Sequence, residues 1–347
     1  MNRRLYLVAF AAVALIAGLS VYVATRVKPQ DLAGAGDLSV KADSVPNLAA
    51  AKGWINSPPL TPNDLKGKVV IYDFWTYSCV NCVRTLPHLR ALYDQYQADG
   101  LVVVGIHSPE FDFEKNHDNV ARAVKELGVT WPVALDDNMD LWHAFDNMYW
   151  PQEYLTDRDG KLRQVYIGEG DYDQKEDDVR TLLGVASTAP LAASGGPDEV
   201  QTAAETPEIH FGLAFGSSEF ASSPEPLTAG TQTFTAPDPV PTDTFALQGA
   251  WTVSDQGIES ADPNAAIVLR YRAAEVNIVA GAGADGGASP AMLGVELDGT
   301  PMPAVPVTGD DLYRVISSGP SGVHTLVLRP QTTGFQAFSF TFGAGTQ

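Results

Sequence analysis

The chain has 347 residues and 45% of them are apolar, so it is long enough for about two domains with buried cores. Its 42 acidic residues outnumber 22 lysines and arginines, which gives a net charge of −20. A surface of this sign repels nucleic-acid phosphates and anionic lipid headgroups, so we expect no nucleic acid partner and no peripheral membrane binding.

Residues 1–28 predict an N-terminal membrane anchor. From Leu5 to Ala24 the chain has 20 consecutive uncharged residues, enough to cross the hydrocarbon core as a helix. A cleaved signal peptide is the alternative, but the bulky Tyr22 stands where cleavage needs a small residue. As a single-pass anchor in the cytoplasmic membrane, this segment would place the remaining chain on the extracytoplasmic, periplasmic side.

Residues 29–59 predict a tether, and residues 60–184 predict an α/β domain. Apolar runs at 68–74 and 101–106 are typical of buried parallel strands, and apolar side chains at helical spacing between them complete a βαβ unit. The further expected elements are a helix at 116–127, a strand at 132–135, a helix at 139–147, a hairpin of strands at 152–156 and 162–167, and a helix at 174–183.

A second domain is expected after a flexible linker. Residues 185–206 are small and polar without aromatics, which is typical of a linker. Residues 207–347 contain short apolar runs separated by Gly, Pro and Asp, a pattern that predicts an all-β sandwich or jelly roll. From residue 206 onward there are 14 acids, four arginines and no lysine. We therefore expect any ligand of this domain to be neutral, such as a neutral glycan.

The two cysteines of the chain, Cys79 and Cys82, form a Cys-x-x-Cys pair between a buried strand and a helix. At a helix N-terminus the free backbone amides stabilise a thiolate, so we expect Cys79 to have a lowered pKa and to attack first. Cys82, one turn later, can then resolve the mixed disulfide. The pattern predicts thiol–disulfide exchange that needs no cofactor.

Other uses of the cysteine pair fit the sequence less well. A structural zinc site needs four ligands, and the chain has no second cysteine pair and no His-x-x-x-His, so no metal is expected. Haem attachment requires a histidine directly after Cys82, where Val83 stands. A structural disulfide across three residues closes too small a loop to add much stability.

Asp73 lies in an otherwise apolar strand, six residues before Cys79. Burial would raise its pKa toward neutrality, so Asp73 could accept the proton of Cys82 through water. The alternative is that Asp73 faces solvent at the end of the strand. Pro87, five residues after Cys82, predicts a kink in the following helix.

The segment from Tyr72 to Cys82, with Pro87 after it, resembles the active site of the thioredoxin family. The resemblance implies that Asp73 is the buried acid, Trp75 the active-site aromatic residue that contacts substrate, and Cys79 with Cys82 the redox pair. It also implies a cis peptide bond between Trp150 and Pro151, facing Cys79, where the backbone of Trp150 would pair with an extended polypeptide substrate. Without this resemblance, Trp150-Pro151 is an ordinary turn or edge-strand pair.

The match extends to membrane-anchored TlpA-type and DipZ-type thioredoxin-like proteins. The stretches 74–79, 107–111 and 149–160 resemble the redox part of the DipZ type, and 269–272 with 338–343 resemble its carbohydrate-binding-like β-domain. DipZ-type proteins carry a multi-helix electron-transfer unit in the membrane, whereas this chain has one apolar span. The resemblance therefore implies a separate membrane electron donor.

Further residues are weaker candidates for a role at the site. Glu110 could lie near the cysteines and tune them, or be a solvated loop acid, and Arg84 could favour the thiolate or only decorate its helix. Trp251, Tyr271 and Tyr313 could form a platform that stacks on sugar rings, but aromatic residues of a sandwich are more often core.

Three functions remain open from the sequence. The first is a tethered thiol-disulfide oxidoreductase that reduces disulfides of exported proteins or peptides. The second is a thiol peroxidase on the same fold, for which Thr76 stands at the expected position while Tyr72 occupies that of an expected proline. In the third, the β-domain binds a glycan or a protein partner and the redox domain is accessory.

Overall fold

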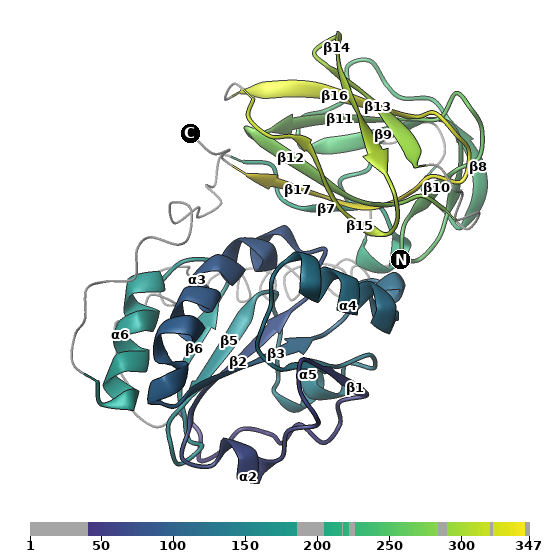
Figure 1. Ribbon diagram of the computed structural model, residues 1–347. Coiled ribbons are helices and arrows are strands. Elements are labelled where there is room, and N and C mark those ends of the chain that lie inside the picture. The colour runs from purple at the N-terminus through teal and green to yellow at the C-terminus, as the bar shows by residue number, and fades with distance from the viewer. Residues whose placement is uncertain are drawn as a thin grey trace, which may run out of the picture. The chain divides into compact units, whose positions relative to one another are not determined.

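The computed structural model describes residues 41–185, 205–216, 218–221, 226–283, 290–319 and 322–343 (Figure 1). The predicted anchor at 1–28, the tether up to residue 40 and most of the predicted linker, 186–204, lie outside the described residues. Among the helices of the described ranges, none combines the length and the apolar character needed to span a membrane.

The first part of the chain forms a six-stranded sheet in the order β1-β4-β3-β2-β5-β6. Strands β2, β3 and β4 run parallel, whereas β1, β5 and β6 pair antiparallel with their neighbours. The strands are β1 (Gly53–Ile55), β2 (Val69–Trp75), β3 (Leu101–His107), β4 (Val133–Leu135), β5 (Gln152–Thr156) and β6 (Leu162–Ile167). The expected βαβ unit and hairpin are confirmed, and β1 adds a strand within the stretch expected to be a tether.

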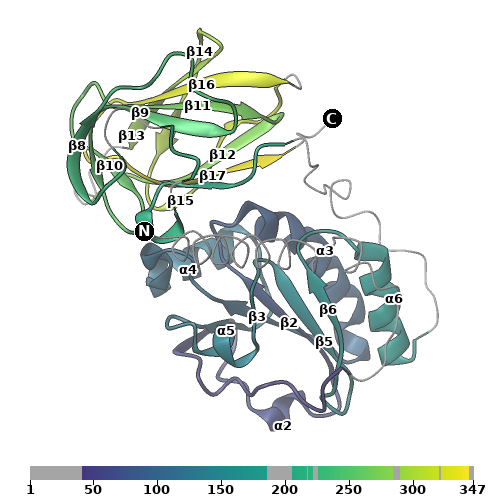
Figure 2. The ribbon, with the colours of Figure 1, turned by 180° about the vertical axis from the view of Figure 1, so that it is seen from behind.

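Helices cover both faces of this sheet because its strands are apolar on both sides. The helices are α2 (Pro62–Leu65), α3 (Val80–Tyr96), α4 (His117–Glu126), α5 (Asp140–Ala144) and α6 (Tyr172–Leu183). One core joins the alternate β2 side chains Val69, Ile71 and Trp75 to α3, α4 and α6. A second core joins the β2 side chains Val70, Tyr72 and Phe74 to α5. Figures 1 and 2 show α3 and α6 side by side along the sheet. Pro87 lies within α3 as expected.

Gly105, in the middle of β3, allows two indole rings to approach the sheet. A Cβ atom at this position would lie 2.9 Å from the Trp75 indole nitrogen and 3.3 Å from that of Trp131. Both tryptophans are fully buried, so neither ring has free space into which it could move. The backbone of β3 therefore serves directly as part of the packing surface.

The second part of the chain is all-β, as predicted. Its strands are β7 (Ile209–His210), β8 (Gly230–Phe234), β9 (Thr244–Val253), β10 (Ile258–Ser260), β11 (Ala266–Arg272), β12 (Glu275–Gly281), β13 (Ala291–Leu297), β14 (Thr300–Val307), β15 (Asp311–Ile316), β16 (Val323–Pro330) and β17 (Gln336–Gly343). They follow the path β14-β13-β16-β11-β9-β10-β17-β12-β15, with β7 on β17 and β8 on β9.

Strand β9 connects two portions of this β-structure. Its first half pairs with β11, its second half pairs with β8 and β10, and Gly249 lies between them with a φ of +81°. Trp251 and Tyr271 belong to the apolar core and are 0% and 1% exposed, which confirms the interpretation as core residues and excludes the sugar-stacking alternative for both. The Tyr313 hydroxyl bonds within its own turn, donating to the Gly309 carbonyl at 2.7 Å.

Candidate active site

The two cysteines lie where the chain leaves β2 and enters α3. Cys79 is the N-cap residue of α3, and its Sγ accepts a hydrogen bond from the Cys82 amide at 3.2 Å. The two thiols are free, and their sulfur atoms are 2.7 Å apart. Cys79 is partly exposed whereas Cys82 is fully buried, so an incoming substrate can reach the first sulfur only.

The pKa of the Cys79 thiol differs from the sequence-based expectation. Burial raises this pKa, and Glu110 and Glu208 add to the increase, while the hydrogen bonds from Cys82 act in the opposite direction. The expectation of a lowered pKa is therefore wrong in its direction, because desolvation outweighs the helix amides. Burial raises the pKa of Cys82 still further above its ordinary range. Cys79 remains the more acidic thiol of the pair.

Asp73 is fully buried, so the alternative of a solvent-facing residue is wrong. Neither of its carboxylate oxygens has a hydrogen-bond partner within the described residues. Burial raises the pKa of Asp73 well above its usual range, Glu153 adds to the increase and Lys175 opposes it. Asp73 also raises the pKa of Cys82. These observations support the expected proton exchange between the acid and the resolving thiol.

Glu114 organises the loop before Cys79, and the sequence reasoning missed it. Its Oε1 accepts hydrogen bonds from the hydroxyls of Thr76 and Ser78, the latter at 2.6 Å. Its Oε2 accepts from the amides of Glu110 at 2.7 Å and Phe111 at 3.0 Å. Burial, followed by the charge of Glu110, raises the pKa of Glu114 to about 7. No local sequence signal places residue 114 next to residues 76–78.

Trp75 supports the active-site loop from inside the core. It is 0% exposed, and its ring meets His107 edge-on with a centroid distance of 5.4 Å. His107 in turn stacks on Tyr77 at 5.7 Å. Trp75 presents no surface to solvent, so this conformation does not provide the substrate contact expected of it.

The peptide bond between Trp150 and Pro151 is cis, as the resemblance implied. Gln152, the next residue, pairs with Phe74 in the ladder between β5 and β2. Continuing that register places Pro151 opposite Trp75, at the end of β2 from which the cysteine loop begins. The Trp150 indole nitrogen donates to the Ser108 carbonyl at 3.0 Å, and its ring packs on Trp142 at 4.0 Å.

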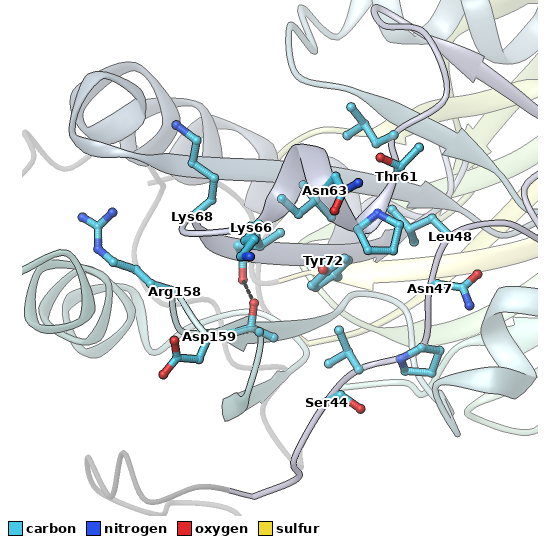
Figure 3. A pocket seen from close by; sticks show the side chains of 18 of the residues that line it. Ser44, Asn47, Leu48, Thr61, Asn63, Lys66, Lys68, Tyr72, Arg158 and Asp159 are labelled. Carbon is cyan, nitrogen blue, oxygen red and sulfur yellow. Dashed lines mark hydrogen bonds between the residues drawn. The ribbon is translucent and has the colours of Figure 1, made fainter.

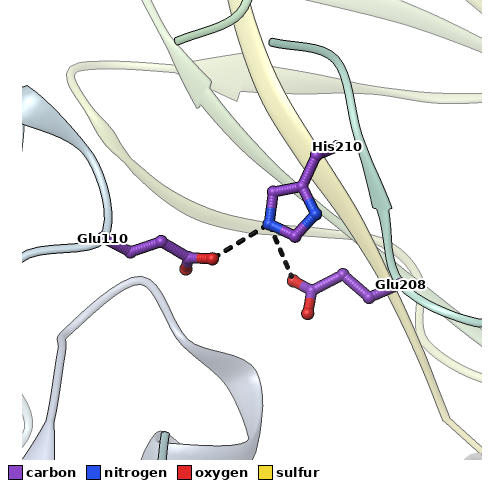
Figure 4. A group of neighbouring side chains, drawn as sticks. All are labelled: Glu110, Glu208 and His210. Atoms are coloured by element: carbon purple, nitrogen blue, oxygen red, sulfur yellow. Dashed lines mark hydrogen bonds and ion pairs between the residues drawn. The ribbon is translucent and has the colours of Figure 1, made fainter. Parts of the chain in front are cut away.

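Glu110 meets two residues of the β-domain, Glu208 and His210 (Figure 4). The His210 Nε2 lies 2.9 Å from a Glu110 carboxylate oxygen and 4.0 Å from one of Glu208. Burial lowers the pKa of His210, but Glu110 and Glu208 outweigh it and the pKa is raised. Burial and Glu110 raise the pKa of Glu208 to about 7. Two carboxylates and an imidazole could together hold a divalent cation.

The Arg84 guanidinium is turned toward two acids. It lies 3.0 Å from a carboxylate oxygen of Glu275, which is 2% exposed, and 3.5 Å from one of Glu169. These ion pairs favour a structural use of Arg84, whereas Glu110 acts on the Cys79 pKa as proposed from the sequence.

A pocket of about 450 Å³ lies at the other end of β2 (Figure 3). Its lining includes Leu65, Lys68, Tyr72, Thr156 and Arg158. Lys68 directly precedes β2 and Val70 is its second residue, while the cysteine loop follows its last residue, Trp75. The pocket is therefore separate from the thiols.

Two family models match the chain. Residues 42–165 match the AhpC/TSA family, and residues 206–343 match the family described as a thioredoxin-like C-terminal domain. The buried acid, the Cys-x-x-Cys pair at a helix start and the cis-proline all lie within residues 42–165 of this chain. The chain is a thioredoxin-like protein that joins an AhpC/TSA-family domain to a thioredoxin-like C-terminal domain.

Among curated proteins, the chain is 39% identical to protein DipZ of Mycobacterium tuberculosis over 309 residues. That alignment covers 86% of this chain and 43% of DipZ, so the chain spans less than half of that relative. It is also 29% identical to the thiol-disulfide oxidoreductase YkuV of Bacillus subtilis, covering 40% of this chain and 93% of YkuV. A solved thioredoxin-like protein in its oxidised form is 30% identical, with 41% of this chain and 96% of that chain covered and a TM-score of 0.38.

Proposed function

We propose that this protein is a thiol-disulfide oxidoreductase that reduces disulfides of proteins or peptides. The observation that carries the proposal is the pair of free thiols 2.7 Å apart, one partly exposed at the helix start and one buried beside an acid. The Cys79 thiolate attacks a substrate disulfide and forms a mixed disulfide. Cys82 then attacks Cys79, Asp73 accepts the Cys82 proton through water, and the substrate leaves with both sulfurs reduced.

The surface next to Pro151 favours an extended polypeptide as the substrate. Met148 and Tyr149 are 71% and 47% exposed, although both are large apolar residues. They directly precede Trp150, whose peptide bond to Pro151 is cis and whose backbone can pair with an incoming strand. Apolar side chains of the substrate strand would pack on these two residues while its disulfide meets Cys79.

We further propose the location and organisation of the whole chain. Residues 1–28 would anchor it in the cytoplasmic membrane, a tether shorter than expected would follow up to about residue 40, and the redox domain, which includes β1, would lie outside. After a linker at 185–206, the β-domain at 207–347 would bind a neutral glycan or a protein partner. The alignment with DipZ covers 86% of the chain, which supports the combination of the two folded domains in one protein. A separate membrane donor would return electrons to the dithiol.

The test measures reduction of a model protein disulfide by the fragment from residue 29. We expect the wild type to be active, Cys79→Ser to fall to the uncatalysed background, and Cys82→Ser to accumulate a mixed disulfide visible by mass spectrometry. A reduction potential near −270 mV would agree with a reductase. Activity retained by Cys79→Ser, or a potential near −120 mV, would contradict the proposal.

A second candidate is a thiol peroxidase, because residues 42–165 match the AhpC/TSA family. In this function Cys79 would attack a peroxide, with Thr76 three residues before it held by Glu114. Peroxide consumption measured beside disulfide reduction separates the two functions. Fast peroxide turnover by Cys82→Ser that depends on added thiol would favour the peroxidase.

A further inference from the structure

We propose that Glu153 and Lys175 are positioning residues for proton transfer at the active site. Their buried ion pair fixes the pH range in which Asp73 can accept the proton of Cys82. The inference rests on the proposed dithiol exchange, and it concerns two residues that the sequence reasoning did not connect with the site.

Asp73 and Glu153 project from the same face of the sheet. They are direct partners in the ladder between β2 and β5, and such partners have neighbouring side chains on one face. Val69, Ile71 and Trp75 alternate with the other β2 side chains and pack in the core that contains Cys82, so Asp73 faces that core too. Two carboxyl groups therefore lie together beneath the resolving thiol.

Lys175 brings one positive charge to these two carboxyl groups. Its Nζ lies 2.6 Å from a Glu153 oxygen, and the two side chains are 1% and 2% exposed. Among the described lysines and arginines, Lys175 is the one that is buried. Within the described part of the chain, the other Glu153 oxygen and both Asp73 oxygens have no hydrogen-bond partner. One cation thus balances Glu153 directly and leaves Asp73 with an incomplete countercharge.

The other polar groups described around the pair do not supply a second positive charge. Helix α3 contributes His88, whose pKa burial and Lys175 lower to about 3, so its ring is neutral. Strand β6 contributes Tyr166, whose hydroxyl donates to Asp178 at 2.6 Å. The Lys175 ammonium lies over the rings of Tyr166 and Tyr172, at 5.1 and 5.6 Å from their centroids. Glu153 and Lys175 are therefore the charges that set the state of Asp73.

The step affected is the release of substrate from the mixed disulfide. The Cys82 proton moves to the Asp73 carboxylate, a bond forms between the sulfurs of Cys82 and Cys79, and the bond from Cys79 to the substrate sulfur breaks. The substrate sulfur leaves with the electron pair and takes a proton from water. The enzyme dithiol is oxidised and the substrate disulfide reduced, after which Asp73 returns its proton to solvent.

The experiment titrates the Asp73 carboxyl carbon by 13C NMR in the reduced protein, with Asp73→Asn used to assign the signal. Glu153→Gln leaves Lys175 to pair with Asp73, so we expect the titration midpoint to fall below that of the wild type. The double variant Glu153→Gln, Lys175→Met loses that cation, so its midpoint should lie above that of the single variant. The pH at which substrate release reaches half its maximal rate should shift in the same order.

Two outcomes would overturn the inference. The first is a titration midpoint of Asp73 in Glu153→Gln that equals that of the wild type. The second is a midpoint in the double variant that is not higher than that of Glu153→Gln. The double variant contains no unpaired buried charge at these positions, so it also reports if the single variant fails to fold. The NMR titration requires no turnover. If the titration midpoints follow the expected order but the protein does not reduce disulfides, the proposed function is refuted and the inference about Glu153 and Lys175 is not.

Discussion

The redox domain and the β-domain differ in what they bury. Beneath and beside its thiols the redox domain buries Asp73, Glu114, Glu153 and Lys175. The β-domain buries Glu275, which pairs with Arg84, but its main core is apolar and aromatic around Trp251. Burying ionisable groups costs free energy unless they are paired. The difference indicates that the first core is organised for proton chemistry and the second for stability.

The largest expected effect tests the β-domain core. Trp251→Ala should lower the free energy of unfolding of that domain by about 3–5 kcal/mol, because it leaves a cavity where a fully buried ring packed. Urea unfolding followed by circular dichroism would measure the loss. Met302→Ala, at a residue 41% exposed, is the control and should change stability by less than about 0.5 kcal/mol. If folded Trp251→Ala alkylates Cys79 at the wild-type rate, the β-domain core serves stability without acting on the thiols. A large change in that rate would contradict this difference between the two domains.

The next effect concerns Glu114 and the dependence of stability on pH. Its pKa rises from 4.5 to about 7 on folding, so the folded protein binds the proton more tightly between these values. The stabilisation that this proton provides is fully present below about pH 4.5. As the pH rises through 7 it is lost, and the free energy of unfolding falls by about 3 kcal/mol.

Urea unfolding at several pH values, compared between the wild type and Glu114→Gln, isolates this change. The variant should lack that decline, while Glu126→Gln on the exposed side of α4 should behave as the wild type does. Parallel pH curves for wild type and Glu114→Gln would show that the buried carboxyl does not titrate as inferred.

The smallest expected effect concerns Glu110, which contacts the β-domain and acts on the pKa of Cys79. Glu110 raises the pKa of Cys79, so Glu110→Gln should lower that pKa and speed alkylation of Cys79 at neutral pH by about two- to five-fold. Iodoacetamide kinetics across pH would measure it, with Asp94→Asn on the outer surface of α3 as the control. Slower alkylation in Glu110→Gln would contradict the assigned sign.

The sequence predicted the local features of the fold and much less of the site. Continuous apolar runs identified β2 and β3, because a strand covered by helices on both faces leaves such a pattern. Strand β1 was missed because three half-buried residues carry almost no periodicity.

Contacts between distant segments explain what the sequence left out of the site. Cys79, Cys82 and Asp73 lie within ten residues of one another, so their grouping was visible. Glu114 acts on Thr76 and Ser78 across more than 35 positions, and His210 reaches Glu110 across 100. The acidic neighbours that help to raise the pKa of Cys79, Glu110 and Glu208, also come from segments distant in the sequence.

The close approach at Gly105 has a consequence for how the family can vary. Adding even one methyl group at position 105 would place an atom 2.9 Å from the Trp75 ring, inside the core that carries the cysteine loop. Positions 75, 105 and 131 are therefore epistatic: an alanine at 105 becomes acceptable only after a tryptophan has been replaced by a smaller residue. In a saturation library selected for redox activity, residue 105 should remain glycine unless such a compensating change comes first.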